Sequence, residues 1–147
     1  MSFVSRMIMV GKDKGPKSGA GFIIVKGKKN KKILALINHD GSYDLPKGAL
    51  DKTDPSFLYC AKRECFEECG LKIKNSDLIK SVPPISSGKL IVFTARTTQK
   101  PKITKNPHTN ILEHSGLKWV TTSEFKQNTS GFLAAAIKQF ENYIFLF

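Results

Sequence analysis

The chain has 147 residues and carries 24 Lys and Arg against 12 Asp and Glu, which gives a formal net charge of +12 at pH 7. This length predicts one domain over residues 1–147, and no apolar run reaches the roughly 18 residues of a membrane span. The first apolar stretch is too short for a signal peptide. We expect no membrane partner. The charge predicts a polyanionic partner: RNA, a polyphosphorylated nucleotide or an inositol polyphosphate. A lysine-rich surface that serves only solubility is the alternative.

Three cysteines, Cys60, Cys65 and Cys69, fall within one short segment. Their odd number and the absence of C-x-x-C spacing argue against a disulfide framework and against a zinc site. We expect buried free thiols, which suit a reducing cytosol and predict a cytoplasmic protein.

The first part of the chain predicts a series of strands. Residues 3–10 indicate a first strand, followed by a basic turn segment. Two apolar, β-branched segments, 19–25 and 31–38, flank a tip at 26–30 whose Gly and Asn are typical of a hairpin. Five lysines lie in and beside this tip, where they are either solvated or touch a phosphate backbone. A short strand is expected at 42–45.

The next segment predicts a helix from about Pro55 to Cys69. Asp54 is the expected N-cap, Pro55 suits the first helical position, and Gly70 predicts a left-handed cap at the end. One apolar stripe recurs at three- and four-residue spacing and is expected to face the core: Leu58, Ala61, Cys65 and Cys69.

Three glutamates, Glu64, Glu67 and Glu68, share one face of this helix because they are three and four residues apart. Like charges at that spacing repel each other, which would raise the pKa of one of them. A divalent cation bound by all three would remove the repulsion, since hard cations take carboxylate oxygens. The alternative is a solvated acidic face on a surface helix.

The second half predicts two more strands, at 71–82 and 89–97, joined by a link rich in Pro and Ser. A polar, lysine-rich loop with two prolines, 99–107, is expected to be mobile and could act as a lid. Leu117 and Trp119 indicate a further strand.

Two helices are expected in the remainder of the chain. Thr122, followed two residues later by Glu124, indicates a helix start. The segment 130–143 predicts an amphipathic closing helix with four expected core positions: Phe132, Ile137, Phe140 and Ile144.

The segment around the glutamates resembles the Nudix box, whose pattern is G-x5-E-x7-R-E-U-x-E-E-x-G-U, with U apolar. The run from Arg63 to Leu71 matches the second half in full, and Leu45-Pro46-Lys47-Gly48 is similar to the lead-in of many members. Asp54 stands where the family has Glu, and eight residues instead of seven separate it from Arg63. This longer box puts the contact between loop and helix in question.

The resemblance implies an α/β fold, a single-domain Nudix-type α/β/α sandwich with a mixed β-sheet. We expect the box helix on one face of the sheet and the closing helix on the other. The resemblance also implies hydrolysis of a diphosphate linked to another moiety, with Mg²⁺ or Mn²⁺ as cofactor. The implied metal ligands are Glu64, Glu67, Glu68 and the carbonyl of Gly48.

Further residues receive roles from the resemblance. Arg63 is expected to hold a carboxylate in place, and Lys47 is either a phosphate contact or a structural lysine. The general base is either Glu67 or Glu113, because relatives use both placements. Glu113 lies six residues before Trp119, similar to the base-bearing loop of RNA 5′-pyrophosphohydrolases and diadenosine tetraphosphate hydrolases. The alternative for Glu113 is a surface residue near a turn.

The substrate is one of several polyanions. The run Cys60-Ala61-Lys62-Arg63-Glu64 resembles a segment of eukaryotic mRNA-decapping enzymes, and we expect an RNA 5′ end, either a cap or a 5′-triphosphate. A dinucleoside polyphosphate and a diphosphoinositol polyphosphate are the alternatives. Tyr43 and Phe22 are considered for base stacking. A Nudix-fold module that binds a nucleotide without cleaving it is the alternative of another class, and the intact glutamates favour the enzyme.

Overall fold

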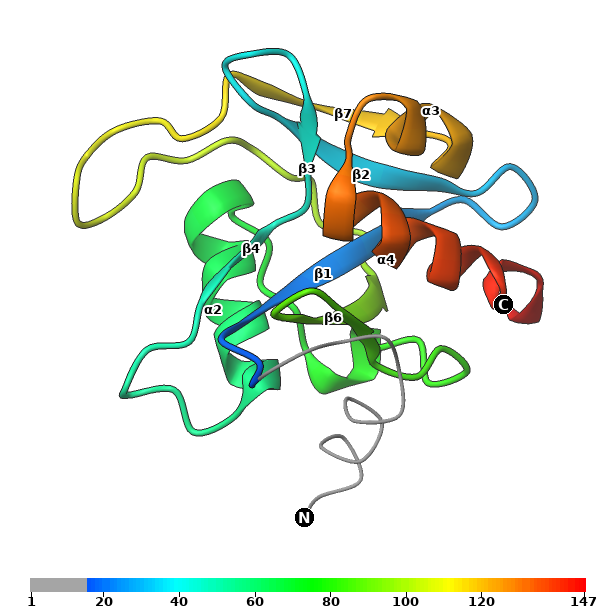
Figure 1. Cartoon of the computed structure of the whole chain (residues 1–147), viewed down its shortest axis with the longest axis horizontal. Coiled ribbons are helices and arrows are strands. Elements are labelled where there is room, and N and C mark those ends of the chain that lie inside the picture. Colours follow the sequence, from blue (N-terminus) through cyan, green and yellow to red (C-terminus); the bar gives the residue numbers. More distant parts are fainter. Residues whose placement is uncertain (1–15) are drawn as a thin grey trace.

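A computed structural model describes residues 16–147, in which seven strands form one sheet with helices on both faces (Figure 1). The expected strand at 3–10 lies outside the described residues, as does most of the basic segment after it. Among the described residues, no helix has both the length and the apolarity needed to cross a bilayer. One domain over residues 1–147 stays a prediction.

The strand order is β3-β2-β1-β6-β5, with β4 paired to the start of β1 and β7 paired to β2. β1 and β6 run parallel and the other pairs are antiparallel, so the sheet is mixed, as expected. The strands are β1 (Gly19–Lys26), β2 (Lys32–Ile37), β3 (Tyr43–Asp44), β4 (Lys47–Ala49), β5 (Ile85–Ser87), β6 (Leu90–Arg96) and β7 (Gly116–Val120). The helices are α2 (Phe57–Cys69), α3 (Thr122–Gln127) and α4 (Gly131–Glu141), with 3-10 turns η1 (Asn75–Asp77) and η2 (Ile144–Leu146).

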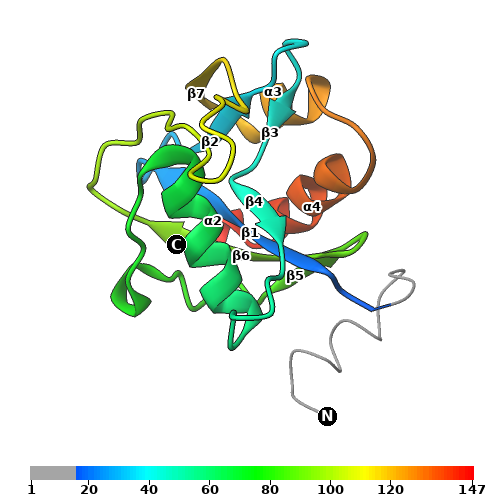
Figure 2. The same ribbon diagram turned by 90° about the vertical axis from the view of Figure 1, so that its left-hand side faces the viewer.

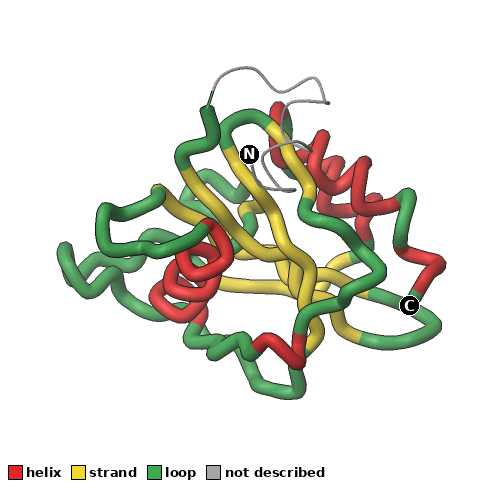
Figure 3. Tube along the Cα trace, turned by 90° about the horizontal axis from the view of Figure 1, so that it is seen from below, coloured by secondary structure: helices red, strands yellow, loops and turns green. Residues whose placement is uncertain are grey.

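β1 lies at the centre of the sheet and is buried on both faces. Its apolar residues alternate between two cores, as the pleat of a strand requires. Phe22 and Ile24 belong to the core beneath α2, whereas Ile23 and Val25 belong to the core beneath α4. Figure 3 shows helices on opposite sides of the sheet, which confirms the α/β/α sandwich. The expected hairpin, the strand around Trp119 and the helix after it are confirmed as well.

The box helix begins two residues later than expected. Ser56 is the N-cap, because its hydroxyl accepts a hydrogen bond from the backbone N–H of Tyr59 at 3.0 Å. Pro55 therefore precedes the helix. The predictions for Asp54 as N-cap and Pro55 as first helical residue are wrong, because the Asp54 carboxylate is engaged by Arg63 instead.

The remainder of α2 agrees with its expected pattern. Ala61, Cys65 and Cys69 are fully buried and Leu58 packs against the same core, which confirms the apolar stripe. All three cysteines are free buried thiols. Gly70 ends the helix in the left-handed conformation, with φ of 70°, as predicted.

The loop between β6 and β7 is fastened to the carboxyl end of α2 (Figure 2). The backbone N–H of Lys102 donates to the carbonyl of Cys69 at 2.9 Å, and that of Thr104 donates to the carbonyl of Glu68 at 3.2 Å. These bonds satisfy carbonyls that a helix end leaves without intrahelical partners. They argue against a mobile lid over residues 99–107.

Residues 71–82 do not form the strand that their alternation predicts. Leu71 and Ile73 are buried, which agrees with the alternation of apolar residues. At Lys72, however, the backbone is hydrogen-bonded by a side chain and not by a neighbouring strand. The Gln99 amide donates to the Lys72 carbonyl at 2.7 Å and accepts from the Lys72 N–H at 2.9 Å. The strand that does pair with β6 on this side is β5, which lies in the segment expected to be a link.

The closing helix is confirmed, with one error in its core. Leu133, Ile137 and Phe140 are buried, whereas Phe132 is 43% exposed. The buried positions are spaced by four and three residues, so Phe132 lies to one side of the stripe. Ile144 lies beyond the helix in η2 and packs partly against the same core.

Candidate active site

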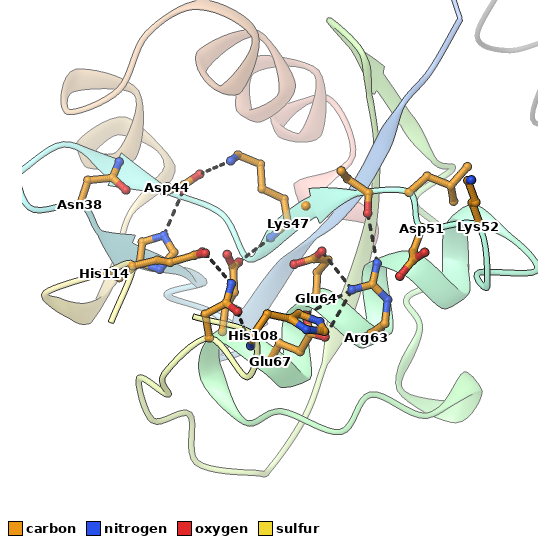
Figure 4. A pocket seen from close by; sticks show the side chains of 16 residues that line it. Asn38, Asp44, Lys47, Asp51, Lys52, Arg63, Glu64, Glu67, His108 and His114 are labelled. Atoms are coloured by element: carbon orange, nitrogen blue, oxygen red, sulfur yellow. Dashed lines mark hydrogen bonds and ion pairs between the residues drawn. The ribbon is translucent and has the colours of Figure 1, made fainter. Parts of the chain in front are cut away.

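A cavity of about 720 Å³ lies between β3, β4, α2 and the loop before β7 (Figure 4). The residues that the sequence predicts for metal binding, catalysis and phosphate contact all line this one cavity: Lys47, Gly48, Arg63, Glu64, Glu67, Glu68 and Glu113. Although the chain carries a net charge of +12, six of its twelve acidic residues are found here: Asp44, Asp51, Glu64, Glu67, Glu68 and Glu113. So many carboxylates in one hollow of a basic protein favour a cation site.

Arg63 links the two halves of the box. Its Nε donates to Asp54 Oδ1 at 2.9 Å and its Nη2 to Asp54 Oδ2 at 2.8 Å, a bidentate pair with a side chain that is 0% exposed. These hydrogen bonds hold the pKa of Asp54 below its usual value. Nη1 of Arg63 lies 3.2 Å from carboxylate oxygens of both Glu64 and Glu67. The one-residue-longer box therefore still makes the contact that the sequence left in question.

Glu64 lies directly against Gly48. A Cβ added to Gly48 would lie between 2.0 and 2.3 Å from the carboxyl atoms of Glu64, so only glycine leaves room for this side chain. Burial raises the pKa of Glu64, while the Arg63 guanidinium opposes the rise. Gly48 thus positions a carboxylate through its lack of a side chain.

Glu68 is the most deeply buried of the three box glutamates, at 9% exposure. Burial raises its pKa to about 9; the hydrogen bond that its Oε1 accepts from the Lys47 N–H at 2.9 Å opposes the rise, and the charges of Asp44 and Glu64 add to it. The sequence attributed a raised pKa to repulsion among the glutamates, whereas burial is the larger cause. Without metal, Glu68 holds a proton at neutral pH, and a cation would take that proton's place.

Two residues that sequence reasoning missed, Asp44 and His114, form a buried pair beside Glu68. Asp44 Oδ2 lies 3.1 Å from His114 Nε2, and Asp44 Oδ1 lies 3.3 Å from Lys47 Nζ. The pair is separated by 70 residues, so no spacing in the sequence connects the two. The position of His114 directly after Glu113 was the signal that could have pointed to it.

Glu113 reaches the cavity from the loop before β7, as expected. Asn106 Nδ2 donates to its Oε1 at 2.8 Å. One oxygen each from Glu68 and Glu113 and one ring nitrogen of His114 lie within 4.8 Å of one another. This placement disfavours the alternative of an unrelated surface glutamate.

The cavity is suited to phosphates more than to bases. Among the described residues that line it there is no Phe, Tyr or Trp. Tyr43 and Phe22 are buried in the two cores, at 9% and 0% exposure, so the suggestion that they stack on a base is wrong. Its four glutamates supply hard oxygen donors, which fit Mg²⁺ or Mn²⁺.

Comparisons with known proteins identify the family and the fold. The model of the NUDIX domain family matches residues 15–140. A curated relative, the uncharacterized Nudix hydrolase NudL of Cronobacter sakazakii (strain ATCC BAA-894), is 37% identical over 57 residues, which cover 39% of this chain and 30% of that protein. The match thus spans less than a third of the relative's length.

Two solved structures share the fold. The Ap4A hydrolase of C. elegans, in a binary complex, has a TM-score of 0.65 at 18% identity and covers 88% of this chain and 98% of its own. The NUDIX domain of Shewanella oneidensis NrtR complexed with ADP ribose has a TM-score of 0.61 at 17% identity, with 97% and 98% covered. The family match spans most of the described chain, and the box residues within it meet at one cavity. This chain belongs to the Nudix family.

Proposed function

We propose that this chain is a metal-dependent hydrolase that cleaves a diphosphate bond in a nucleotide-type substrate. The observation that carries the proposal is the gathering of Glu64, Glu67, Glu68 and Glu113 around one open cavity in a basic protein. A diphosphate repels nucleophiles through its own negative charge. Its hydrolysis therefore calls for cations at the reacting phosphate.

The proposed cofactor is Mg²⁺ or Mn²⁺, with Glu64, Glu67, Glu68 and the Gly48 carbonyl as protein ligands. When bound, the cation neutralises phosphate oxygens and lowers the pKa of an attacking water. Arg63 keeps Glu64 and Glu67 in place. Its guanidinium is already paired with protein carboxylates, so we assign it no contact with substrate.

The general base is Glu67 or Glu113. Glu67 lies on the cavity side of α2, where Arg63 Nη1 lies 3.2 Å from its carboxylate. Glu113 is exposed and bonded to the neutral amide of Asn106. Gln variants of both residues separate the roles. The variant of the base should lose about 10²- to 10⁴-fold in kcat. Because Glu67 is also a proposed metal ligand, Glu67→Gln should weaken metal binding in either case, whereas Glu113→Gln should keep the metal affinity if Glu113 acts only as the base.

We propose an RNA 5′ end, a cap or a 5′-triphosphate, as the substrate. A second groove, of about 390 Å³, lies at the β1–β2 hairpin and is lined by Lys29, Lys31, Lys32 and Phe145, the last of which is 76% exposed. Lysine binds phosphate as a point charge, and an exposed aromatic ring can stack on a base. Lys47 in the cavity is a proposed contact of the scissile phosphates.

Other substrates have specific support. A cavity whose described lining holds no Phe, Tyr or Trp also suits a diphosphoinositol or a dinucleoside polyphosphate, and the fold is shared with an Ap4A hydrolase. A non-catalytic module that binds a nucleotide is the alternative of another class, since the NrtR NUDIX domain was crystallised with ADP ribose. The cluster of four glutamates favours the enzyme.

A substrate panel with Mg²⁺ or Mn²⁺ tests the proposal. It should contain capped RNA, triphosphorylated RNA, diadenosine polyphosphates, nucleotide sugars, ADP-ribose and diphosphoinositols. We expect turnover of an RNA 5′ end, and none in excess chelator. If only a small polyphosphate is turned over, that compound and not RNA is the substrate. Tight nucleotide binding without hydrolysis would support the binding module.

The proposed location of the reaction is the cytoplasm. The three cysteines are buried free thiols, the state that a reducing compartment maintains. RNA 5′ ends with caps or triphosphates would meet the enzyme there.

A further inference from the structure

Of the three histidines in the chain, His114 is the buried one. It is 4% exposed, whereas His39 and His108 are exposed. One of its ring nitrogens lies within 4.8 Å of oxygens from Glu68 and Glu113. Its Nε2 lies 3.1 Å from Asp44 Oδ2, on the side away from the box helix (Figure 4). The imidazole thus has a carboxylate partner at Nε2 and two cavity carboxylates near one of its ring nitrogens.

This arrangement matches how proteins prepare a histidine for a metal. A metal-binding histidine donates a hydrogen bond from its other ring N–H to a carboxylate. This bond fixes the ring orientation and leaves the lone pair of the remaining nitrogen available to the metal. Asp44 serves as that carboxylate, and it is itself held by Lys47 Nζ at 3.3 Å and by the Leu45 N–H at 2.9 Å. In an octahedral site with bonds of about 2.1 Å, ligand atoms lie about 3 to 4 Å apart, so the cluster needs only a small contraction.

We propose that His114 is a nitrogen ligand of the active-site cation, which it binds together with Glu68 and Glu113 through the ring nitrogen that Asp44 leaves free. This rests on the proposed function as a metal-dependent hydrolase, and it adds a ligand that the box glutamates do not supply. Imidazole suits transition metals, while Mg²⁺ prefers oxygen, so the site selects Mn²⁺ over Mg²⁺. Glu113 is then a ligand, and the role of base passes to Glu67.

Pulsed electron paramagnetic resonance of the full chain loaded with Mn²⁺ tests the ligand directly. Electron spin echo envelope modulation reports nitrogen bound to Mn²⁺. We expect imidazole ¹⁴N modulation that changes to ¹⁵N modulation when only the histidines are labelled with ¹⁵N. The modulation should vanish in His114→Phe and persist in His108→Phe, the matched control, because His108 lines the same cavity outside the cluster.

A double variant keeps the test decisive if His114→Phe fails to fold. His39→Phe combined with His108→Phe leaves His114 as the sole histidine of the chain, so modulation in that protein assigns the ligand. Absence of histidine modulation in the Mn²⁺-loaded wild type would overturn the inference, while continued turnover would leave the proposed function standing. Failure of Mn²⁺ to bind would overturn the inference, and failure of both Mn²⁺ and Mg²⁺ to bind would overturn the proposed function as well.

Calorimetric titration with each metal gives an independent readout. In His114→Phe we expect the Kd for Mn²⁺ to weaken about tenfold or more, and the Kd for Mg²⁺ to weaken less than about threefold. Equal weakening for both metals would mean that the histidine only supports the local packing. Unchanged Kd values for both would equally rule out a ligand role.

Discussion

β1 runs from its pairing with β4 to the hairpin that leads into β2 (Figure 1), and its two ends carry opposite chemistry. At its start, Gly19 to Gly21 pair with β4 beside a cavity that gathers six of the twelve acidic residues. At its far end, Lys26 opens a hairpin with five lysines in residues 26–32. At about 3.3 Å per residue, the eight-residue strand separates these ends by about 23 Å.

The two ends also differ in how their charges are held. The cavity carboxylates are fixed by partners such as Arg63 and the backbone of Lys47. Most hairpin lysines are exposed, although Lys26 lies 5.3 Å from the Trp119 ring and Lys31 lies 5.1 Å from the Phe147 ring. The positive net charge therefore reflects surface lysines such as those of the hairpin and gives no sign of the acidic cavity. It indicates the class of partner, while the fixed minority of acidic residues indicates the chemistry.

Removing one cavity carboxylate should give the largest effect. Glu68→Gln should lower kcat/KM by about 10³-fold or more, because a metal ligand supplies several kcal/mol of transition-state stabilisation. The fold should survive, since Gln resembles the protonated Glu68 of the metal-free protein. Steady-state kinetics and thermal unfolding in chelator measure the two quantities. Glu141→Gln on α4 is the control and should keep full activity; equal losses in both variants would contradict the comparison.

Misplacing a second carboxylate should cost less. Gly48→Ala puts a methyl group where the Glu64 carboxyl lies, and that flexible side chain must move aside. A displacement of this kind costs about 10²-fold in activity with little loss of stability. Gly116→Ala, whose Cβ would meet only Ile37 Cδ1 at 3.9 Å, is the matched control. Full activity of Gly48→Ala would show that the position of Glu64 is unimportant.

Breaking the pair of Asp54 and Arg63, which supports the cavity, should lower the stability of the fold. Asp54→Asn removes the charge that pairs bidentately with Arg63, so the free energy of unfolding should fall by about 2 kcal/mol. Urea unfolding measures this loss. Asp51→Asn, an exposed aspartate in the same loop, should change stability by less than about 0.5 kcal/mol. If the two variants were equally stable, the longer box would not depend on this contact.

In the metal-free protein, the stability should depend on pH through the buried Glu68. The pKa of Glu68 is raised to about 9 in the folded protein from its usual 4.5, so the folded state keeps a proton that the unfolded chain has lost. In chelator, the free energy of unfolding should fall as pH rises from about 5 to about 9, by at most about 1.4 kcal/mol per pH unit from this group. Glu68→Gln should lack this component. Identical pH profiles of the two proteins would contradict the assignment.

Much of the fold and the acidic face of the box helix could be predicted because those signals are local. The spacing of Glu64, Glu67 and Glu68 fixes their shared face, and the glycine at 70 stops the helix. Likewise, the continuous apolar run of β1 indicates a strand that is buried on both faces.

The errors arise where a contact joins distant parts of the chain. Asp44 and His114 are 70 residues apart, and only the pairing of β2 with β3 and β7 brings them together. Residues 71–82 alternate like a strand, but the amide of Gln99 occupies the backbone groups of Lys72, and a 3-10 turn interrupts the segment at Asn75–Asp77. Asp54 is a residue type that commonly caps helices, but its carboxylate is bound by Arg63, nine residues further along the chain.

We propose that the cavity performs hydrolysis while the hairpin only holds the rest of an RNA. One measurement tests it most directly: kcat/KM of a long triphosphorylated RNA and of the matching dinucleotide, at low and moderate salt, in the wild type and in a variant with Lys28, Lys29, Lys31 and Lys32 changed to Gln. We predict a roughly tenfold loss for the RNA and a salt slope that is shallower by about 0.7 for each phosphate that the variant no longer neutralises, with dinucleotide turnover nearly unchanged. Equal efficiency on both substrates in the wild type, with the same salt slope, would contradict the account.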